Sequence, residues 1–342
     1  MASPPQTYLD LIRACDNFPN IEFPKTSAYI DSPNPRNWFY WQLLLPSDPR
    51  PHGFIHPSVI AAMPWTPHFH LSPPTHRPRS VQILDPSGTD PRGASNAAFA
   101  AVVQRAKDLG VFESLNKSKS TEDYRVVGAE YPTVRVRRAA APLFGIACLG
   151  AHLTMYTRSN SKGEGEGKGG DGLKIWVPRR SRNMSSFPGK LDSSIAGGIA
   201  AHESALECLV HEAAEEASLP ESLIREKARA CGTITYVGMT ETGIEDGSAV
   251  PGLLYVHDME VGETVVPKPM DDEVEEFYLW DVPQVRDALL RGEFKTNCAL
   301  VMIDFFIRHG IITQDNEPDY LEIITRLHRP LPVPLSPTNI AL

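Results

Sequence analysis

The sequence predicts an α+β protein of about two domains. Its 342 residues exceed the roughly 150 residues of a typical domain. Segments with helical spacing of apolar residues stand beside short apolar runs that are typical of strands. A glycine turn also leads directly into an amphipathic helix rich in glutamate. Both kinds of secondary structure are therefore expected along the whole chain.

The first part of the chain is predicted to alternate helices and strands with proline-rich connections. A helix is expected over Tyr8–Cys15, where the apolar residues share one face. A strand is expected over Trp38–Leu45, followed by connecting loops through about Pro91. A second helix is expected over Asn96–Leu109, capped by Asn96 or by the serine before it.

The second part is predicted to be richer in strands. Strands are expected over Thr133–Arg137, Gly145–Thr157, Leu173–Val177, Gly232–Val237, Gly252–Met259 and Val274–Trp280. Helices are expected over Pro283–Leu290, Cys298–Arg308 and Asp319–Leu327. Residues 158–172, which are rich in Gly, Lys and Glu, are predicted to be a disordered insertion between two strands.

Composition excludes several classes of protein. A net charge of −9 argues against general nucleic-acid binding, which needs a basic surface. Five scattered cysteines without a CxxC pair indicate reduced thiols rather than a disulfide framework. The longest apolar stretch, Leu143–Leu153, is shorter than the ~20 residues of a membrane-spanning helix. We therefore expect a cytoplasmic protein without nucleic-acid or membrane partners, whose oligomeric state stays open.

The glutamate-rich helix after residue 195 has two contrasting faces. Its apolar stripe consists of Leu206, Leu209, Val210, Ala213 and Ala217. Its other face carries Glu203, Glu207, Glu212, Glu215 and Glu216, and no Lys or Arg lies between Lys190 and Arg225. Each like-charge pair three or four residues apart costs about 0.2–0.5 kcal/mol. A hard divalent cation between the carboxylates would offset this repulsion.

The spacing of these residues resembles the Nudix box. Six positions fall in register with that motif: Gly197, Glu203, Glu212, Glu215, Glu216 and Leu219. Three positions depart from it: His211 replaces the arginine, Ser218 replaces the last glycine, and Ala213 is small for an aliphatic position. The resemblance implies a Nudix α/β/α sandwich with a mixed sheet, preceded by a smaller α+β N-terminal domain.

A wider resemblance covers most of the chain. Segments 141–145, 174–181, 187–192 and 297–310 are similar to the thiamine-pyrophosphokinase-related Nudix proteins of fungi and plants. The resemblance implies an N-terminal substrate-selecting domain over 1–138, a Nudix hydrolase domain over 139–329 and a Pro-rich tail over 330–342. It also implies a small-molecule substrate, thiamine diphosphate or its oxidised analogues, cleaved to the monophosphate.

The same resemblance implies roles for the residues of the motif. Glu215 and Glu216 would be the main ligands of Mg²⁺ or Mn²⁺, and Glu212 would be a further ligand or would assist the base. The backbone carbonyl of Gly197 could reach the metal ion, and Glu203 would orient the cluster. His211 would take over the work of the missing arginine, which it can do as a cation only when protonated. The sequence does not separate base from ligand among the glutamates.

Other candidate residues have ordinary alternatives. Arg179, Arg180, Arg182 and Lys190 could hold a diphosphate, or form a solvated basic loop. Glu273 or Glu276 could add a carboxylate, although a charged strand end is the more frequent explanation. Trp176, Tyr236 and Trp280 could stack on a cationic ring, although strand aromatics are more often core. His68 and His70 read as loop histidines, and Trp38–Trp41 and Trp65 as candidates for a substrate pocket.

Two other functions are compatible with the motif. A Nudix hydrolase could act instead on oxidised nucleoside triphosphates or nucleoside diphosphate sugars, because the motif determines diphosphate chemistry and not the organic group. A non-catalytic Nudix-fold protein could bind a diphosphate without cleaving it. His211 and Ser218 support that alternative, whereas the complete set of Glu212, Glu215 and Glu216 argues against it.

Overall fold

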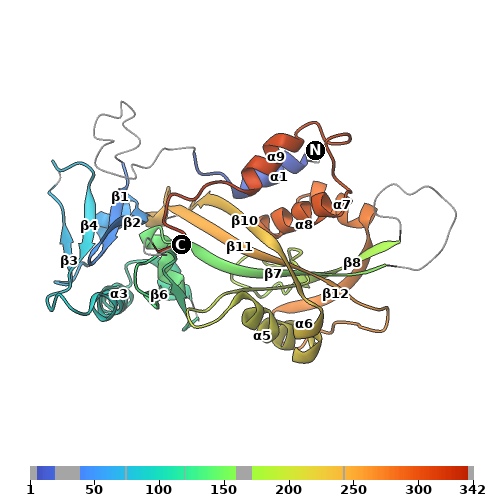
Figure 1. Ribbon diagram of the computed structural model, residues 1–342, viewed down its shortest axis with the longest axis horizontal. Coiled ribbons are helices and arrows are strands. Elements are labelled where there is room, and N and C mark those ends of the chain that lie inside the picture. Colours follow the sequence, from blue (N-terminus) through green and yellow to red (C-terminus); the bar gives the residue numbers. More distant parts are fainter. Residues whose placement is uncertain are drawn as a thin grey trace.

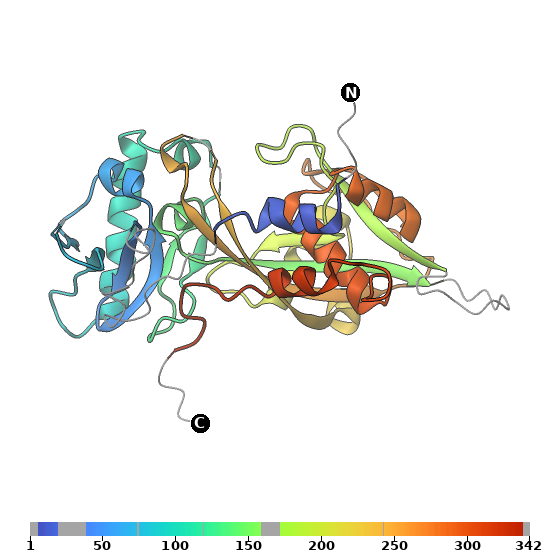
Figure 2. The same cartoon turned by 90° about the horizontal axis from the view of Figure 1, so that it is seen from above.

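A computed structural model describes residues 6–19, 39–73, 75–118, 120–158, 172–241 and 243–337. The chain has the expected α+β architecture, with helices on both faces of a mixed sheet. A smaller sheet with its own helices lies beside the larger one along the long axis of the molecule (Figures 1 and 2). No helix in the described ranges is long and apolar enough to cross a membrane.

The smaller sheet has the strand order β2-β1-β4-β3. Its strands are β1 (Trp41–Leu45), β2 (Asp48–Ile55), β3 (Phe69–Leu71) and β4 (Ser80–Ile83). Three helices belong to this part of the chain, α2 (Pro57–Ala62), α3 (Pro91–Asp108) and α4 (Glu113–Lys117). A separate hairpin consists of β5 (Asp123–Arg125) and β6 (Arg135–Arg137), and a 3₁₀ helix, η3 (Arg138–Phe144), follows it. Leu43, Phe99, Val102 and Phe144 lie in the hydrophobic cluster that joins these elements.

Two expectations for this region were wrong. The proline-rich stretch before Pro91 contains β2, α2, β3 and β4 instead of loops alone. The strand β2 carries two prolines because it lies at the edge of its sheet, where a missing N–H group breaks no ladder. Helix α3 begins at Pro91 and not at Asn96, because Asp90 accepts a hydrogen bond from Gly93 N at 2.9 Å and proline suits the first helical turn.

The larger sheet has six strands in the order β10-β11-β7-β8-β12, with β9 paired to β7. The strands are β7 (Cys148–Arg158), β8 (Leu173–Arg180), β9 (Ile195–Gly198), β10 (Arg229–Met239), β11 (Ala249–Glu260) and β12 (Val274–Asp281). Only the β7–β11 pair is parallel among these neighbours, so the sheet is mixed. The five strands expected in this region are confirmed, and β9 is additional.

Helices cover both faces of the larger sheet (Figure 1). One face packs against α5 (Ala205–Ala217) and α6 (Glu221–Lys227). The other packs against α1 (Tyr8–Cys15), α7 (Val282–Leu290), α8 (Thr296–Arg308) and α9 (Tyr320–Leu327). The two faces have separate hydrophobic clusters, so the sheet is the middle layer of an α/β/α arrangement.

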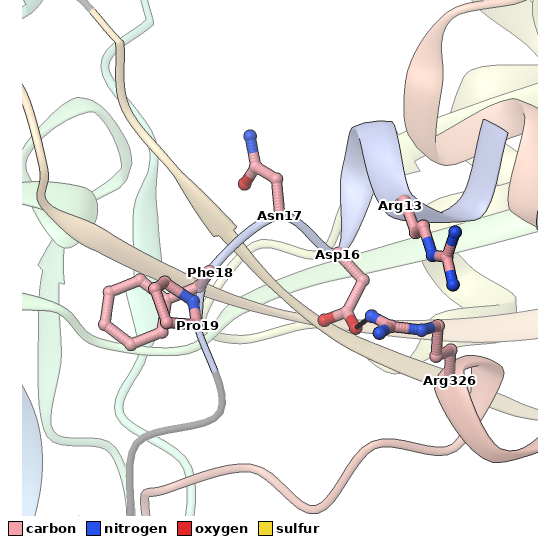
Figure 3. A pocket seen from close by; sticks show the side chains of 6 residues that line it. All are labelled: Arg13, Asp16, Asn17, Phe18, Pro19 and Arg326. Atoms are coloured by element: carbon pink, nitrogen blue, oxygen red, sulfur yellow. Dashed lines mark hydrogen bonds and ion pairs between the residues drawn. The ribbon is translucent and has the colours of Figure 1, made fainter. Parts of the chain in front are cut away.

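Helix α1 belongs by contact to the larger sheet although it opens the chain. Its apolar residues share a cluster with α8 and α9. Asp16, at its C-terminus, is 3% exposed and accepts a hydrogen bond from Val237 N at 3.0 Å. The carboxylate also pairs with Arg326 at 3.1 Å and Arg329 at 2.8 Å. Figure 3 shows Asp16 facing Arg326 beside a cavity of about 300 Å³.

The predicted domain limits stay predictions. By contact, α1 belongs to the second half of the molecule and η3 belongs to the first. The predicted disordered insertion over 158–172 falls almost entirely on residues 159–171, which lie outside the described residues. Within the tail, Leu331 and Val333 are buried against the α5 side of the sheet.

We expect Asp16→Asn to lower the free energy of unfolding by about 3 kcal/mol, because breaking a buried ion pair leaves the remaining charges without their partner. Urea unfolding measures this effect. Asp10→Asn, on the exposed side of the same helix, is the control and should cost less, because an amide oxygen can still accept the hydrogen bond of its capping box. Equal losses in the two variants would show that the Asp16 contacts do not hold α1 in place.

Candidate active site

The glutamate-rich segment forms helix α5, as the spacing predicts. Ser204 caps the helix: its Oγ accepts from Glu207 N at 3.2 Å, and Glu207 Oε2 accepts from Ser204 N at 2.9 Å. Leu209, Ala213 and Ala217 are fully buried against the sheet. Glu207 therefore serves the helix terminus, and the remaining glutamates carry the charge of the site.

One of the two glycines in β9, Gly197, faces this helix. The segment Ile195–Gly198 is a strand paired with β7, and not the turn expected from its glycines. A Cβ atom at Gly197 would overlap Oε1 of Glu212, so glycine leaves the space in which this carboxylate lies. Glu216 also reaches β9, where its Oε2 accepts from Ala196 N at 3.4 Å. Glu212 and Glu216 thus turn toward the sheet, whereas Glu215 is exposed.

Burial raises the pKa of both inward carboxylates. Burial is the main cause that raises the pKa of Glu212 to about 8, with repulsion from Glu215 and Glu273 adding to it and Arg138 opposing it. Burial and the charge of Glu212 raise the pKa of Glu216 well above its usual range. The charge of Glu273, the residue just before β12, contributes to the raised pKa of both residues. Glu276 is exposed within β12 itself.

The donor set suits a hard divalent cation. Glu212 and Glu216 offer carboxylate oxygens in the space that Gly197 leaves open, and Glu215 lies on the same helix. Among the described residues, no three His, Cys, Asp or Glu side chains already converge as a metal site. Mg²⁺ is usually held by one or two carboxylates plus substrate phosphates rather than by a complete protein cage. The residues present therefore fit such an ion.

His211 and Ser218, the two departures from the motif, each have a local explanation. His211 Nδ1 lies 2.7 Å from Glu203 Oε1, and so His211 contacts one acidic residue of the motif, as an arginine there would. Ser218 ends α5 in the left-handed conformation at φ 55°, where glycine has no steric cost. Its hydroxyl donates to Lys268 O at 3.1 Å, which offsets part of that cost.

The arginines expected to hold a phosphate have other partners. Arg180 is 8% exposed and pairs with Asp192 at 2.8 Å. Arg179 lies over the ring of Tyr278 and donates to Gly189 O at 2.9 Å. Arg182 is exposed and lies 3.6 Å from Glu275. Arg179 and Arg180 are therefore engaged in contacts within the fold. Arg182 is the one of these three arginines that is accessible to a substrate.

The aromatic and histidine candidates lie in ordinary structural environments. Trp176 and Tyr236 pack in the hydrophobic clusters on the two faces of the larger sheet. Trp280 stacks on Tyr278, with ring centroids 4.8 Å apart. Trp41 is buried in the N-terminal cluster, and Trp65 packs against it. His68 and His70 lie at β3, and Trp38 lies outside the described residues.

Sequence reasoning missed a group from the N-terminal part. Arg138 and Tyr124 lie against Gly198, where a Cβ atom would be 2.7 Å from Arg138 Cζ and would overlap the Tyr124 hydroxyl. Arg138 also pairs with Glu122 at 2.8 Å. The spacing of these residues carries no signal, because they meet β9 only in the folded chain. The one signal in the sequence was Gly198, a second glycine beside the one in the motif, because a glycine in a strand can indicate close approach of another group.

A cavity of about 330 Å³ opens beside this contact. One wall comes from the β5–β6 hairpin region and the other from the loop between β9 and α5, where Ala201 N donates to Asp123 O at 2.8 Å. The lining residues are Thr121, Glu122, Asp123, Thr133, Arg135, Ala200, Ala201 and His202. Both parts of the chain therefore contribute to this cavity.

Comparison with known proteins identifies relatives over much of the chain. No protein-family model matches it. It is 38% identical to the uncharacterized protein YJR142W of Saccharomyces cerevisiae over 239 residues, which are 68% of each chain. It is 36% identical to Nudix hydrolase 20 and 34% identical to Nudix hydrolase 24, both chloroplastic proteins of Arabidopsis thaliana, over 194 residues. These cover 56% of this chain and 47% and 48% of the plant proteins, so the chain spans about half their length.

Similarity to solved structures is weaker. A MutT protein from Methanosarcina mazei aligns with 50% of this chain and 96% of its own, at 17% identity and a TM-score of 0.32. A similarity at this level carries no weight for the function. The stronger evidence about function comes from the sequence relatives and from the arrangement of residues around α5.

The raised pKa of Glu212 makes the metal-free protein sensitive to pH. The folded state binds this proton more tightly than the unfolded state, so the stabilising contribution is complete below the usual pKa of 4.5 and is lost as pH rises through about 8. Glu216 acts in the same direction. We expect Glu212→Gln to reduce the fall in unfolding free energy between pH 5 and pH 8, as measured by urea unfolding in chelator. Glu221→Gln, which removes an exposed charge at the start of α6, is the control. An unchanged pH slope in Glu212→Gln would contradict the assignment.

Proposed function

We propose that this chain, a member of the Nudix hydrolase family, is a metal-dependent hydrolase that cleaves a diphosphate bond in a small-molecule substrate. The observation that carries the proposal is the pair Glu212 and Glu216, which turns toward β9 where Gly197 leaves room for a carboxylate. The identity to two plant Nudix hydrolases supports the same class of enzyme. The reaction class is hydrolysis of an acid anhydride.

Mg²⁺ or Mn²⁺ would be held by Glu212, Glu215, Glu216 and the carbonyl of Gly197. When bound, such an ion neutralises charge on phosphate oxygens and makes an attacking water more acidic. Glu212 lies in the space that Gly197 leaves open, and where it does not ligate the ion it would take the proton that this water loses. Glu203 and His211, which contact each other at 2.7 Å, would hold the loop before α5 in position. Arg182, in the turn after β8, remains the candidate for a substrate contact, while Arg179 and Arg180 would support the fold around it.

For the substrate we propose thiamine diphosphate or an oxidised analogue, cleaved to the monophosphate and phosphate. The cavity between the β5–β6 hairpin and residues 200–202 supports a selecting role for the N-terminal part, because both parts line it. We also propose a cytoplasmic location, which the five free cysteines support.

A substrate panel tests this assignment. We expect kcat/KM with Mg²⁺ to be higher for oxothiamine diphosphate than for thiamine diphosphate, and lower for 8-oxo-dGTP and ADP-ribose. Thr121→Trp, which fills the cavity, should reduce the preference by raising KM for the thiamine compounds, while Arg92→Ala on the outer side of α3 should not. A nucleotide as the best substrate would overturn the thiamine assignment, and no hydrolysis of any diphosphate would favour a binding protein.

The carboxylate assignment predicts a large loss of turnover. Glu212→Gln or Glu216→Gln should lower kcat at least about a hundredfold, because a neutral amide is a poor ligand for a hard cation and a poor base. Hydrolysis should also stop in excess chelator and return with Mg²⁺ or Mn²⁺. Glu221→Gln, at the start of α6, is the control that should keep activity. Turnover at the normal rate in either site variant would refute the metal and base roles.

His211 is predicted to act through its contact with Glu203. His211→Ala should lower kcat about tenfold, because Glu203 loses its partner at 2.7 Å, whereas His211→Arg should retain or raise activity. Steady-state kinetics measure both variants. If kcat of His211→Ala equals that of the unchanged protein, the side chain at position 211 has no role in turnover.

A further inference from the structure

The β5–β6 hairpin has one apolar face and one basic face. Tyr124 and Val136 are buried in the N-terminal cluster. Because side chains alternate along a strand, the opposite face carries the charged residues of both strands: Asp123, Arg125, Arg135 and Arg137. Arg125 and Arg135 are directly opposite each other in the ladder, an arrangement in which like charges destabilise a sheet. No described residue forms a hydrogen bond or an ion pair with the Arg125 side chain. An anion bound at this pair would offset the repulsion.

The two carboxylates of this hairpin do not balance its arginines. Glu122 pairs with Arg138 at 2.8 Å. Asp123 is shared, since it lies 3.4 Å from Arg137 and 3.5 Å from Arg135. Both distances exceed the ~2.7–2.9 Å of a strong charge-assisted hydrogen bond. The Arg135 side chain is also 59% exposed, so its donors remain accessible to another anion.

Arg135 lines the cavity of about 330 Å³ beside the proposed active site. Thr121 and Thr133 line the same cavity. Guanidinium and hydroxyl groups are donors that suit the oxygens of a phosphate group. The facing wall, residues 200–202, connects β9 to α5, the two elements that carry Gly197 and the glutamates. A group bound at Arg135 therefore borders the segment that carries the hydrolytic site.

The backbone of Thr133 is strained where it meets this cavity. Its φ is 64°, in the left-handed region, which is unfavourable for a β-branched residue. Asn96 of α3 holds this conformation, because its Nδ2 donates to Thr133 O at 3.3 Å and its Oδ1 accepts from Arg135 N at 2.9 Å. Backbone strain of this kind is concentrated at ligand-binding sites. Asn96 thus fixes the backbone of two residues that line the cavity.

We propose that Arg135, Thr133 and Thr121 form a phosphate-binding subsite separate from the glutamate cluster, with Arg125 adding positive charge. This inference rests on the proposed function and deepens it, because it assigns a phosphate contact to the N-terminal part of the chain. The occupant is a phosphate group, either carried by the organic monophosphate or free in solution. The glutamate cluster keeps the metal ion and the hydrolytic step.

The test measures binding to the full chain in excess chelator, where the glutamates hold no metal ion and repel anions. The probes are radiolabelled inorganic phosphate and thiamine monophosphate, in equilibrium dialysis. Arg135→Gln should weaken binding about tenfold, because charge-assisted contacts are lost. Arg135→Lys should retain part of the affinity, because it keeps the charge without the planar guanidinium. A loss for both probes supports a subsite for any phosphate, and a loss for thiamine monophosphate alone supports one that also needs the organic group.

Two further variants separate binding from folding and from overall charge. Arg225→Gln is the matched control, since this exposed arginine of α6 pairs with Glu221 and does not line the cavity. Thr133→Gly should weaken binding several-fold while the urea midpoint stays about the same, because glycine adopts a φ of 64° without strain. Unchanged affinity in Arg135→Gln, an equal loss in Arg225→Gln, or no binding of either probe at millimolar concentration would overturn the inference.

These measurements involve no hydrolysis, so they fail separately from the proposed function. Full activity in Glu212→Gln and Glu216→Gln would refute the hydrolytic roles of the glutamates without changing the binding result. Loss of turnover in those variants, together with phosphate binding that does not depend on Arg135, would refute the subsite alone.

Discussion

The close approach of the Glu212 carboxylate to the backbone of β9 is the contact on which the site depends. It exists because Gly197 has no side chain, and because the apolar stripe of α5 presses the helix against the sheet. Burial of two carboxylates in this position is unfavourable, and their raised pKa values record that cost. A site of this kind uses repulsion between like charges to create affinity for a cation.

The glutamates in and just before α5 lie in different surroundings, which reduces the repulsion between them. Glu207 is removed from the cluster by the cap, and Glu203 is paired with His211. Glu215 remains exposed, where water screens its charge. Glu212 and Glu216 face inward with raised pKa values, to which Glu273, just before β12, contributes. The arrangement keeps a stable helix while leaving two carboxylates available for chemistry.

The N-terminal part of the chain and the part that contains the larger sheet exchange elements with each other. Helix α1 packs on the larger sheet through Asp16 and its two arginines, whereas η3 returns to the N-terminal cluster. Ala201 N and Asp123 O form a direct backbone link beside the glycine pair. Substrate selection and hydrolysis would therefore take place across contacts between the two parts, where ligand sites are common.

The sequence by itself determined the mixed α+β class, helix α5 and its acidic face, and most strands of the larger sheet. These features follow from local periodicity, capping residues and the spacing of glutamates, all of which are readable along the chain. Only the tertiary structure decided which charges meet. Arg180 was buried against Asp192, Glu273 was brought toward α5, and Arg138 arrived from a distant segment. Such contacts depend on how the elements pack in space, and residue spacing along the chain does not encode them.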